Sequence, residues 1–489
     1  MLSKSQYVRG LQCYKSLWLL KHRKELRDKP DAAQQALFET GNTVGDLACQ
    51  LFPGGIEIDY DSDNFDGMVA QTRRLIADGQ EVIYEATFKE NGVFAMADIL
   101  VKNGDGWDVY EVKASTGVND YHLDDASVQW YALSRVLKLN RIAIVHINNQ
   151  YVRQGELDVH QLFQVEDVTD SVLERFEYVS ASIDVMEAML KADEPQMQIG
   201  VHCDDPHTCD FKGYCWRDIP NPSVFNLYRM NGAKKFDLYH RGIVTYEDMP
   251  PDGPLSEIQQ VQIQSSLSST PLIQPEVISD FIQSLTYPIY FFDFETFMEA
   301  IPRFDGQRPY MQMPFQYSLH ILHENGELEH KEYLGNEHID PRPGLVVQML
   351  EDLGEQGSIV AFNQSFEISR IKELAKDFDE YSDRLLELIP RFKDLIEPFR
   401  NLGYYHPDMN GSFSIKSVLP ALFPNDPELD YKKLEIQNGG MAMDTFANLH
   451  RLKDPSQRDS IRQALLAYCR LDTLAMVRIY EELSQTINE

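Results

Sequence analysis

The sequence predicts an α/β protein with more than one domain, and three observations support this prediction. Strand-like runs alternate with helical runs in two separate parts of the chain, 82–148 and 285–363. The chain has 489 residues, long enough for two to four domains. Its 43% hydrophobic and 25% charged residues are ordinary for a globular protein. We therefore expect at least two separate hydrophobic cores.

In the N-terminal part, residues 1–52 have a helical pattern that stops at "LFPGG", where Pro and Gly break it. The turn "KENG" contains an Asn-Gly pair, which is typical of a tight β-hairpin. This turn separates the first two of three expected strands, at 82–88, 93–101 and 107–114, which are followed by a helix at 124–139 and a fourth strand at 141–148.

The C-terminal part begins with three expected strands, 287–296, 314–322 and 328–334, the last two joined at Asn325-Gly326. A helix at 344–353, an apolar strand at 358–363 and further helices follow. Three antiparallel strands followed by an alternating helix and strand are typical of a ribonuclease-H-like mixed sheet flanked by helices. We expect domains at 1–217 and 285–489, joined by a helical linker region at 218–284 that is richer in Pro, Ser and Gln.

The formal net charge of −32 argues against a general nucleic-acid coat protein, because most of the surface would repel phosphate. It does not exclude a nuclease, since metal-binding carboxylates count as negative here. No apolar run approaches the roughly 18 residues that a membrane helix needs, and the first residues lack a signal-peptide pattern. We expect a cytoplasmic protein without a membrane partner, whose six cysteines are reduced.

The run "YFFDFETF" places two carboxylates in an apolar strand. Side chains alternate faces along a strand, so Asp293 and Glu295 project from one face while Phe292 and Phe294 lie on the other. Two neighbouring buried carboxylates repel each other, and a hard cation such as Mg²⁺ or Mn²⁺ between them removes that cost. The alternative is an edge strand with a hydrated polar face.

Further carboxylates lie downstream. Glu367 begins a helix directly after the strand 358–363, which is expected beside the first strand, and Tyr468 and Asp472 lie four apart on one helical face. Such a set can hold two metal ions for phosphodiester cleavage.

The motifs "DFET", "FNQSFE" and "YCRLD" resemble the three motifs of the DEDD exonucleases, in the subclass with Tyr four residues before the last Asp. This resemblance implies that Tyr468 orients the attacking water. It also implies four metal ligands: Asp293, Glu295, Glu367 and Asp472. The sequence departs from the family at Glu367, where Asp is usual.

A second acidic group lies in the N-terminal part. Asp98 is near the end of one expected strand, and Glu111 and Lys113 are two apart on the next. A hairpin makes these strands neighbours, so Asp98 and Glu111 can share a metal with Lys113 near the scissile phosphate. The alternative is an ion network on a solvated sheet face.

Four cysteines flank this unit, and their pattern suggests a metal rather than disulfides: Cys13, Cys203, Cys209 and Cys215. Four thiolates can hold either [4Fe–4S] or Zn²⁺. Cys49 and Cys469 are isolated in helical runs and are expected in the core.

This order of Cys, D…ExK…Q and three close Cys resembles the RecB-family PD-(D/E)xK nucleases that carry an iron–sulfur staple. The resemblance implies a restriction-endonuclease-like core, a catalytic Gln129 beside Lys113, and a structural [4Fe–4S] cluster, which we favour over Zn²⁺. Relatives often supply a histidine where Gly45 stands, and Glu85 is the candidate to compensate.

Together the motifs resemble a bacterial family that joins a RecB-like iron–sulfur nuclease domain to a DEDD exonuclease-like domain. The resemblance implies a metal-dependent DNA nuclease with two active sites, one of them a 3′-to-5′ exonuclease, that acts in DNA repair or in defence against foreign DNA. Two alternatives stay open: an RNA exonuclease, since nothing in the sequence reads the 2′-OH, or a nucleic-acid-binding scaffold with one or both sites degenerate.

Overall fold

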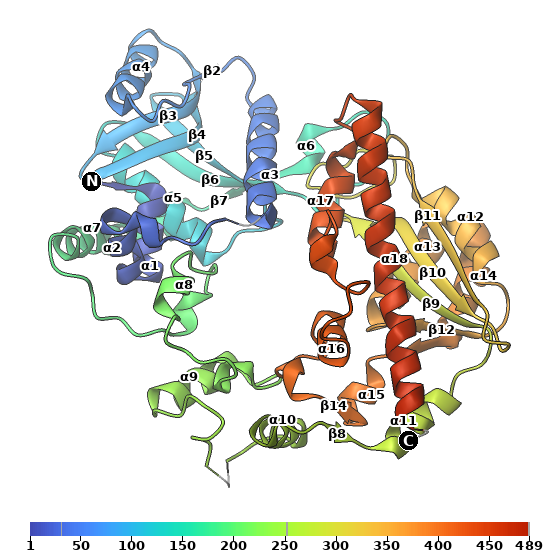
Figure 1. Cartoon of the computed structure of the whole chain (residues 1–489). Coiled ribbons are helices and arrows are strands. Elements are labelled where there is room, and N and C mark those ends of the chain that lie inside the picture. Colours follow the sequence, from blue (N-terminus) through green and yellow to red (C-terminus); the bar gives the residue numbers. More distant parts are fainter. Residues whose placement is uncertain (31, 251–252, 488–489) are drawn as a thin grey trace. The chain divides into compact units, whose positions relative to one another are not determined.

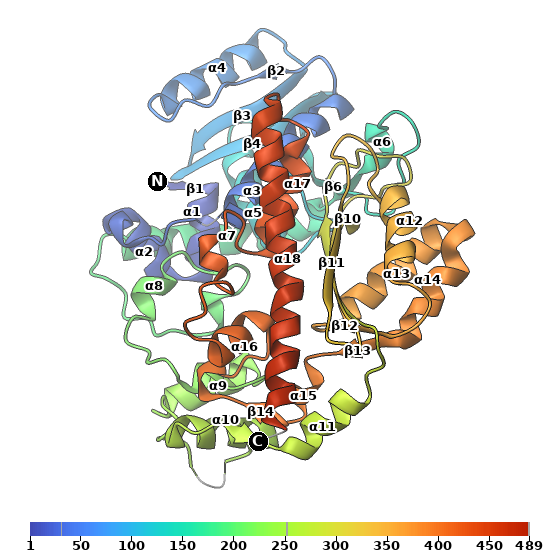
Figure 2. The same ribbon diagram turned by 45° about the vertical axis from the view of Figure 1, so that its right-hand side comes forward.

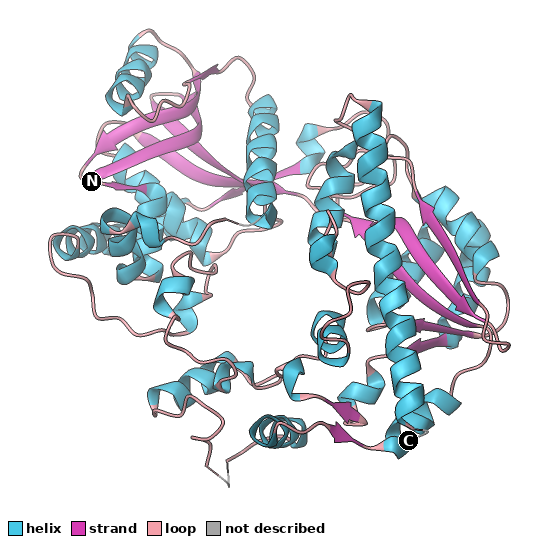
Figure 3. Cartoon of the chain, viewed as in Figure 1, coloured by secondary structure: helices cyan, strands magenta, loops and turns pink. Residues whose placement is uncertain are grey.

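A computed structural model describes residues 1–30, 32–250 and 253–487. The chain folds into two compact units, one formed by Met1–Asp218 with Glu299–Tyr310 and the other by Ile219–Met298 with Met311–Glu489. Both units combine helices with a mixed sheet, so the α/β prediction is confirmed (Figure 3). None of the described helices combines the length and the apolar character needed to cross a bilayer.

The first unit contains a seven-stranded sheet of order β2-β3-β4-β5-β6-β7, with β1 pairing to β4 (Figure 1). Its strands are β1 (Leu2–Ser3), β2 (Ile56–Glu57), β3 (Val82–Glu90), β4 (Val93–Asn103), β5 (Gly106–Lys113), β6 (Leu139–Ile147) and β7 (Phe163–Asp167). The predicted hairpin between β3 and β4 is confirmed, because Asn91 and Gly92 both have positive φ at 50° and 76°. The antiparallel register brings Asp98 of β4 near the strand that carries Glu111 and Lys113.

Helices cover both faces of this sheet. They are α1 (Lys4–Gln12), α2 (Tyr14–His22), α3 (Ala32–Ala48), α4 (Phe65–Ala77), α5 (Asp120–Leu133), α6 (Val159–Leu162), α7 (Thr169–Met189) and α8 (Lys212–Cys215). Alternate residues of a strand enter different cores: Val109 and Ile142 pack in the core that α5 and α7 share, whereas Tyr110 and Ala143 pack with Val44 of α3. Both faces of the central strands are therefore buried.

The segment Glu299–Tyr310 follows a strand of the second unit in sequence but belongs to the first unit. The Tyr310 hydroxyl donates a hydrogen bond to the Ala114 carbonyl, and the amide of Arg153 donates to the Gln307 carbonyl at 3.0 Å. Ala300 is buried in the core that contains Val44. This segment is thus an integral part of the first unit.

The second unit contains a five-stranded sheet of order β11-β10-β9-β12-β13. Its strands are β9 (Ile289–Phe297), β10 (Met313–Leu322), β11 (Leu328–Leu334), β12 (Ser358–Ala361) and β13 (Phe392–Asp394). The strands β9, β10 and β11 are antiparallel, whereas β12 and β13 run parallel to β9. The four predicted strands and their order are confirmed, and the short β13 was missed.

The two faces of this sheet bury different residues of β9. Phe292 and Phe294 pack in the core that contains residues of α12 (Arg342–Asp352), α13 (Ser365–Asp377) and α14 (Ser382–Leu388). Ile289 and Phe291 pack with residues of α18 (Pro455–Thr486). Figure 2 shows α18 on one side of the sheet and α12, α13 and α14 on the other. The predicted alternation along β9 is confirmed, and it turns Asp293 and Glu295 toward α18.

The remaining elements of the second unit are α9 (Gly232–His240), α10 (Glu257–Ser268), β8 (Leu272–Ile273), α11 (Pro275–Gln283), α15 (Glu397–Arg400), β14 (Tyr404–Tyr405), α16 (Ile415–Leu422) and α17 (Gly439–Leu449). β8 pairs with β14, and Ile278 and Phe281 of α11 enter the core beneath α18. The end of the predicted linker is therefore packed into this unit.

Candidate functional site

The second unit brings four carboxylates together. Asp293 and Glu295 lie on β9, Glu367 lies in the first turn of α13, and Asp472 lies on α18. Each charge acts on others in the set: those of Asp472, Glu295 and Glu367 all raise the pKa of Asp293. The convergence expected from the sequence is thus present in the structure.

Burial and mutual repulsion disfavour the charged forms of these groups. Both raise the pKa values of Asp293 and Glu295 well above the usual range. Burial, together with the charge of the nearby Asp394, raises the pKa of Glu367 to about 8. Burial also raises the pKa of Asp472, to about 6. A bound cation would favour the charged form of all four carboxylates.

Glu367 is only 3% exposed, and its Oε2 is buried without a hydrogen-bond partner among the described residues. An unsatisfied buried carboxylate oxygen is costly unless a ligand accounts for it. The Glu367 side chain therefore places an unpaired carboxylate oxygen in the protein interior.

Two tyrosines lie at Asp472. The Tyr431 hydroxyl donates a 2.5 Å hydrogen bond to Oδ1 of Asp472, and hydrogen bonding by both Tyr431 and Tyr468 opposes the rise in the Asp472 pKa. Tyr431 comes from the short 3-10 turn Tyr431–Lys433, and its ring centroid lies 6.0 Å from that of Tyr468. Tyr468 is 4% exposed. The arrangement holds Asp472 in a defined orientation.

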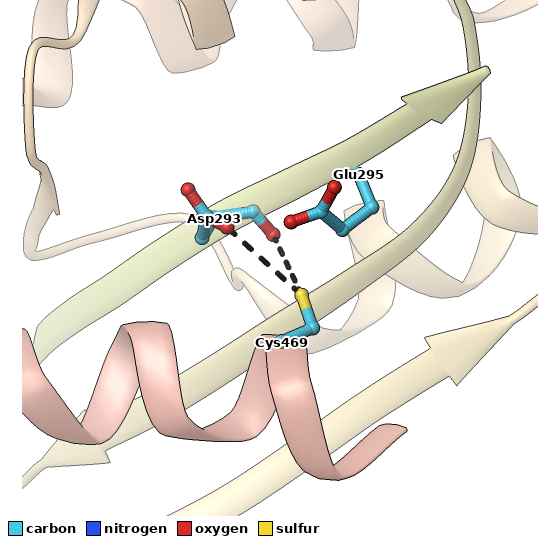
Figure 4. A group of neighbouring side chains, drawn as sticks. All are labelled: Asp293, Glu295 and Cys469. Carbon is cyan, nitrogen blue, oxygen red and sulfur yellow. Dashed lines mark hydrogen bonds between the residues drawn. The ribbon is translucent and has the colours of Figure 1, made fainter. Parts of the chain in front are cut away.

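Three further groups border this site. A Cβ built on Gly439, the first residue of α17, would lie 3.7 Å from Oε2 of Glu295. The positive charge of exposed Lys416 on α16 lowers the pKa values of Glu295 and Asp472. Figure 4 shows the buried thiol of Cys469 pointing from α18 toward Asp293 and Glu295.

The first unit assembles a second group around Glu111 on β5. Glu111 is 1% exposed, and its Oε1 accepts hydrogen bonds from Lys113 at 2.7 Å and from Lys4 at 2.6 Å. Gln129 on α5 donates a hydrogen bond to the other carboxylate oxygen, and Asp98 accepts a 2.6 Å hydrogen bond from the Val112 amide. The four residues expected from the sequence are therefore brought together.

The charges in this group shift the pKa values of Glu111 and Asp98 in opposite directions. Burial alone would raise the pKa of Glu111, but Lys113 and Lys4 hold it below its usual value. Burial and the charge of Glu111 raise the pKa of Asp98 well above its usual value. Burial, with repulsion from Glu111, also raises the pKa of Glu85 to about 7. Glu111 is thus the charged acid of this group.

These acids border an open cleft in the first unit. Its lining includes Asp98, Glu111 and Glu85, together with Gly45 of α3. A Cβ on Gly45 would meet nothing within 4 Å. Glu85 has a φ of +54° and lies between the register pairs Tyr84–Ile99 and Ala86–Ala97, which places it across from Asp98.

The four cysteines of the N-terminal pattern line one pocket in the first unit: Cys13, Cys203, Cys209 and Cys215. Cys13 is the N-cap of α2, and its Sγ accepts a hydrogen bond from the Ser16 amide at 3.4 Å. Segments almost two hundred residues apart in sequence thus line one pocket with their cysteines.

Several neighbours of the predicted residues were not foreseen: Lys4, Asp125, Lys416, Tyr431 and Cys469. Asp125 precedes Gln129 by four residues, a spacing that places both on one face of the helix and could have identified Asp125 from the sequence. Asp125 accepts a hydrogen bond from Lys113. Cys469 was expected in the core and is buried, yet it lies beside Asp293. Lys4 and Tyr431 come from distant segments that carry no local pattern.

Comparison with known proteins gives a family match and partial relatives. The family described as "Domain of unknown function (DUF2779)" matches residues 290–414, which include Asp293, Glu295 and Glu367. "Uncharacterized protein UU173" of Ureaplasma parvum serovar 3 is 28% identical over 221 residues, 41% of this chain and 31% of that protein. "Uncharacterized protein MG366 homolog" of Mycoplasma pneumoniae is 29% identical over 214 residues, 40% of this chain and 32% of that protein. The matched part of the chain spans about a third of the length of these curated relatives.

Proposed function

We propose that this protein is a metal-dependent nuclease of DNA with two active sites. The observation that carries the proposal is the set of four carboxylates in the second unit, three of them buried, which repel one another. Asp293 and Glu295 face α18, which carries Asp472. A fold gains nothing from burying such a set without a cation. The proposal extends to a ribonuclease-H-like fold for the second unit and a restriction-endonuclease-like fold for the first, each favoured by its strand order.

The donor set of the second unit fits a hard divalent cation. All four predicted ligands are carboxylates, the chemistry that Mg²⁺ and Mn²⁺ prefer, and the unsatisfied Oε2 of Glu367 is an available donor. We assign metal binding to Asp293, Glu295, Glu367 and Asp472. When bound, the metal would supply an activated water and stabilise the charge that develops on the phosphodiester.

Residues around the carboxylates suit the rest of the reaction. The Tyr468 hydroxyl lies next to Asp472, where it would orient the attacking water for 3′-to-5′ trimming. The exposed ammonium of Lys416 and the N-terminus of α17 at Gly439 both favour an approaching phosphate. Tyr431 would fix the orientation of Asp472 through its hydrogen bond.

In the first unit, Asp98 and Glu111 are the proposed metal ligands. Lys113 would lie near the scissile phosphate and offset its developing negative charge, while Gln129 holds the second oxygen of Glu111. Lys4 adds a second positive charge at the same carboxylate oxygen. The open cleft lined by Asp98 and Glu111 would give a nucleic-acid strand access to the proposed metal ligands.

The four-cysteine pocket is proposed to hold a structural [4Fe–4S] cluster. Four thiolates can hold either [4Fe–4S] or Zn²⁺, and the resemblance of the cysteine order to that of iron–sulfur nucleases favours the cluster. The bound cluster would join α2 to residues 203–215.

Digestion of single- and double-stranded DNA with Mg²⁺ or Mn²⁺ tests the proposal, using protein purified without oxygen. Asp293→Ala and Glu111→Ala should each remove part of the activity. Matched RNA oligonucleotides separate a DNA nuclease from an RNA exonuclease. The proposal is wrong if the wild type leaves every substrate intact and binds without cleaving, since that result would indicate a scaffold.

A further inference from the structure

The thiol of Cys469 lies directly beside the carboxylate pair of the second unit. Cys469 is fully buried on α18, between Tyr468 and Asp472 in sequence. Its Sγ lies 3.9 Å from the Asp293 carbonyl oxygen and 4.0 Å from Oδ2 of the same residue (Figure 4). Both are long, weak hydrogen bonds, so the thiol has no strong partner that a competing ligand would have to displace.

The neighbouring Glu295 strengthens the case for a ligand at this place. Its side chain is 7% exposed and is directed toward the thiol (Figure 4), and no hydrogen bond or ion pair in the described part of the chain satisfies its carboxylate. A buried unsatisfied carboxylate is costly. The site therefore offers an unused oxygen donor beside a sulfur donor.

The geometry is close to that of a three-ligand metal site. One donor atom each from Asp293, Glu295 and Cys469 can be chosen so that all three lie within 4.8 Å of one another. A tetrahedral ion with a sulfur ligand at about 2.3 Å and an oxygen ligand at about 2.1 Å places the two ligands about 3.6 Å apart. The 4.0 Å separation of Sγ from Oδ2 needs only a small contraction to reach that value.

We propose that Asp293, Glu295 and Cys469 form a binding site for a thiophilic divalent cation such as Zn²⁺ or Cd²⁺. Two oxygens and one sulfur suit a borderline or soft ion better than Mg²⁺ or Mn²⁺, which prefer oxygen alone. On binding, a metal–sulfur bond replaces the S–H bond of Cys469 and the proton passes to solvent, with no change in oxidation state.

This binding has a regulatory consequence that rests on the proposed nuclease function. Zn²⁺ held by Asp293 and Glu295 would occupy the position that the hard catalytic ion needs. We therefore expect Zn²⁺ to inhibit Mn²⁺-dependent cleavage by the second unit, with Cys469 setting the sensitivity.

The direct test is a titration of the full chain with Cd²⁺ alone, following the thiolate-to-metal charge-transfer absorption and the bound Cd²⁺ per chain. The wild type should bind one equivalent more than Cys469→Ser, or bind it at least tenfold more tightly. Cys49→Ser changes a thiol that lines the cleft of the first unit, and it should keep the equivalent that Cys469→Ser loses. The four-cysteine pocket contributes equally to all three proteins.

A second variant distinguishes loss of the metal site from misfolding of Cys469→Ser. Asp293→Asn keeps the thiol but removes a charged oxygen donor, and it should also lose the extra Cd²⁺ equivalent. Equal stoichiometry, affinity and charge-transfer intensity in the wild type and both site variants would overturn the inference.

Cleavage in Mn²⁺ with increasing Zn²⁺ then tests the regulatory consequence. The Zn²⁺ concentration for half-inhibition, relative to each protein's own Mn²⁺ activity, should rise at least tenfold in Cys469→Ser. If no protein cleaves DNA or RNA but the Cd²⁺ difference is present, the nuclease proposal fails and the metal site stands. If cleavage occurs and the Cd²⁺ difference is absent, the metal site fails and the nuclease proposal stands.

Discussion

The Tyr431 hydroxyl donates a 2.5 Å hydrogen bond to Oδ1 of Asp472, joining residues 41 positions apart in sequence. This bond opposes the effect of burial, which raises the pKa of Asp472 to about 6. A metal ligand must be ionised, so this bond would make Asp472 a better ligand for the proposed metal near neutral pH.

Tyr431→Phe removes this hydroxyl and should raise the Asp472 pKa further. A hydrogen bond to a charged acceptor contributes about 1.5–3 kcal/mol, so we expect kcat/KM to fall at least about tenfold. The pH optimum of cleavage should move upward, which a loss of packing alone would not cause. The matched control is Tyr287→Phe. In the wild type, the Tyr287 hydroxyl lies 3.2 Å from the Tyr480 hydroxyl. An unshifted pH profile would contradict this role.

The raised carboxylate pKa values predict how stability depends on pH in the metal-free protein. The folded-state pKa of Glu367, about 8, exceeds its usual value of 4.5, so the folded state binds protons more tightly than the unfolded chain. The stabilisation is complete below pH 4.5 and is lost as pH rises toward 8.

Thermal unfolding in a chelator between pH 5 and 8 measures this loss, which we expect to lower the midpoint by about 5 °C. Mn²⁺ should restore the midpoint most at high pH, where the ligands are ionised. Glu367→Gln should flatten the metal-free curve, whereas Glu355→Gln, which changes an exposed loop residue, should not. A curve that is equally steep in both variants would exclude Glu367 as the source.

In the first unit, Lys4 and Lys113 share one oxygen of buried Glu111. Lys4→Met removes one of the two positive charges that stabilise the Glu111 carboxylate, and it should lower the free energy of unfolding by about 2 kcal/mol. Calorimetry should show a lower unfolding midpoint for the first unit, and its share of cleavage should decrease. Lys24→Met, at an exposed position, should change neither. An unchanged midpoint in Lys4→Met would mean that Lys113 alone balances Glu111.

The four-cysteine pocket predicts a stabilising cluster. Protein purified without oxygen should contain iron and acid-labile sulfide, and Cys209→Ala should lose both and melt at a lower temperature. Cys49 is outside the pocket, so Cys49→Ala should keep the cluster. Zinc in place of iron and sulfide would reject the cluster assignment.

Local pattern was sufficient for much of the fold. Alternation in "YFFDFETF" predicted the two faces of β9, and Asn91-Gly92 predicted the β3–β4 hairpin, because both signals come from neighbouring residues. The short β13 was not predicted, since three residues paired to a parallel neighbour carry no period of their own.

The residues of the candidate sites also fall into two groups, those that local pattern predicts and those that long-range packing brings in. Residues on predicted elements, such as Glu111 and Asp472, could be placed in their acidic groups from spacing and resemblance. Lys4 and Tyr431 could not, because long-range packing brings them to their carboxylates. Cys469 was expected in the core, and only the arrangement of α18 against β9 identifies the oxygens beside its thiol.

The measurement that tests the central claim most directly is Mn²⁺-dependent digestion of single-stranded DNA labelled at the 3′ or the 5′ end. Wild type, Asp293→Ala and Lys113→Ala are compared, each purified without oxygen. We predict that Asp293→Ala abolishes stepwise trimming from the 3′ end while Lys113→Ala removes a distinct set of cuts. Three proteins with identical product patterns, or with no products, would contradict a nuclease with two active sites.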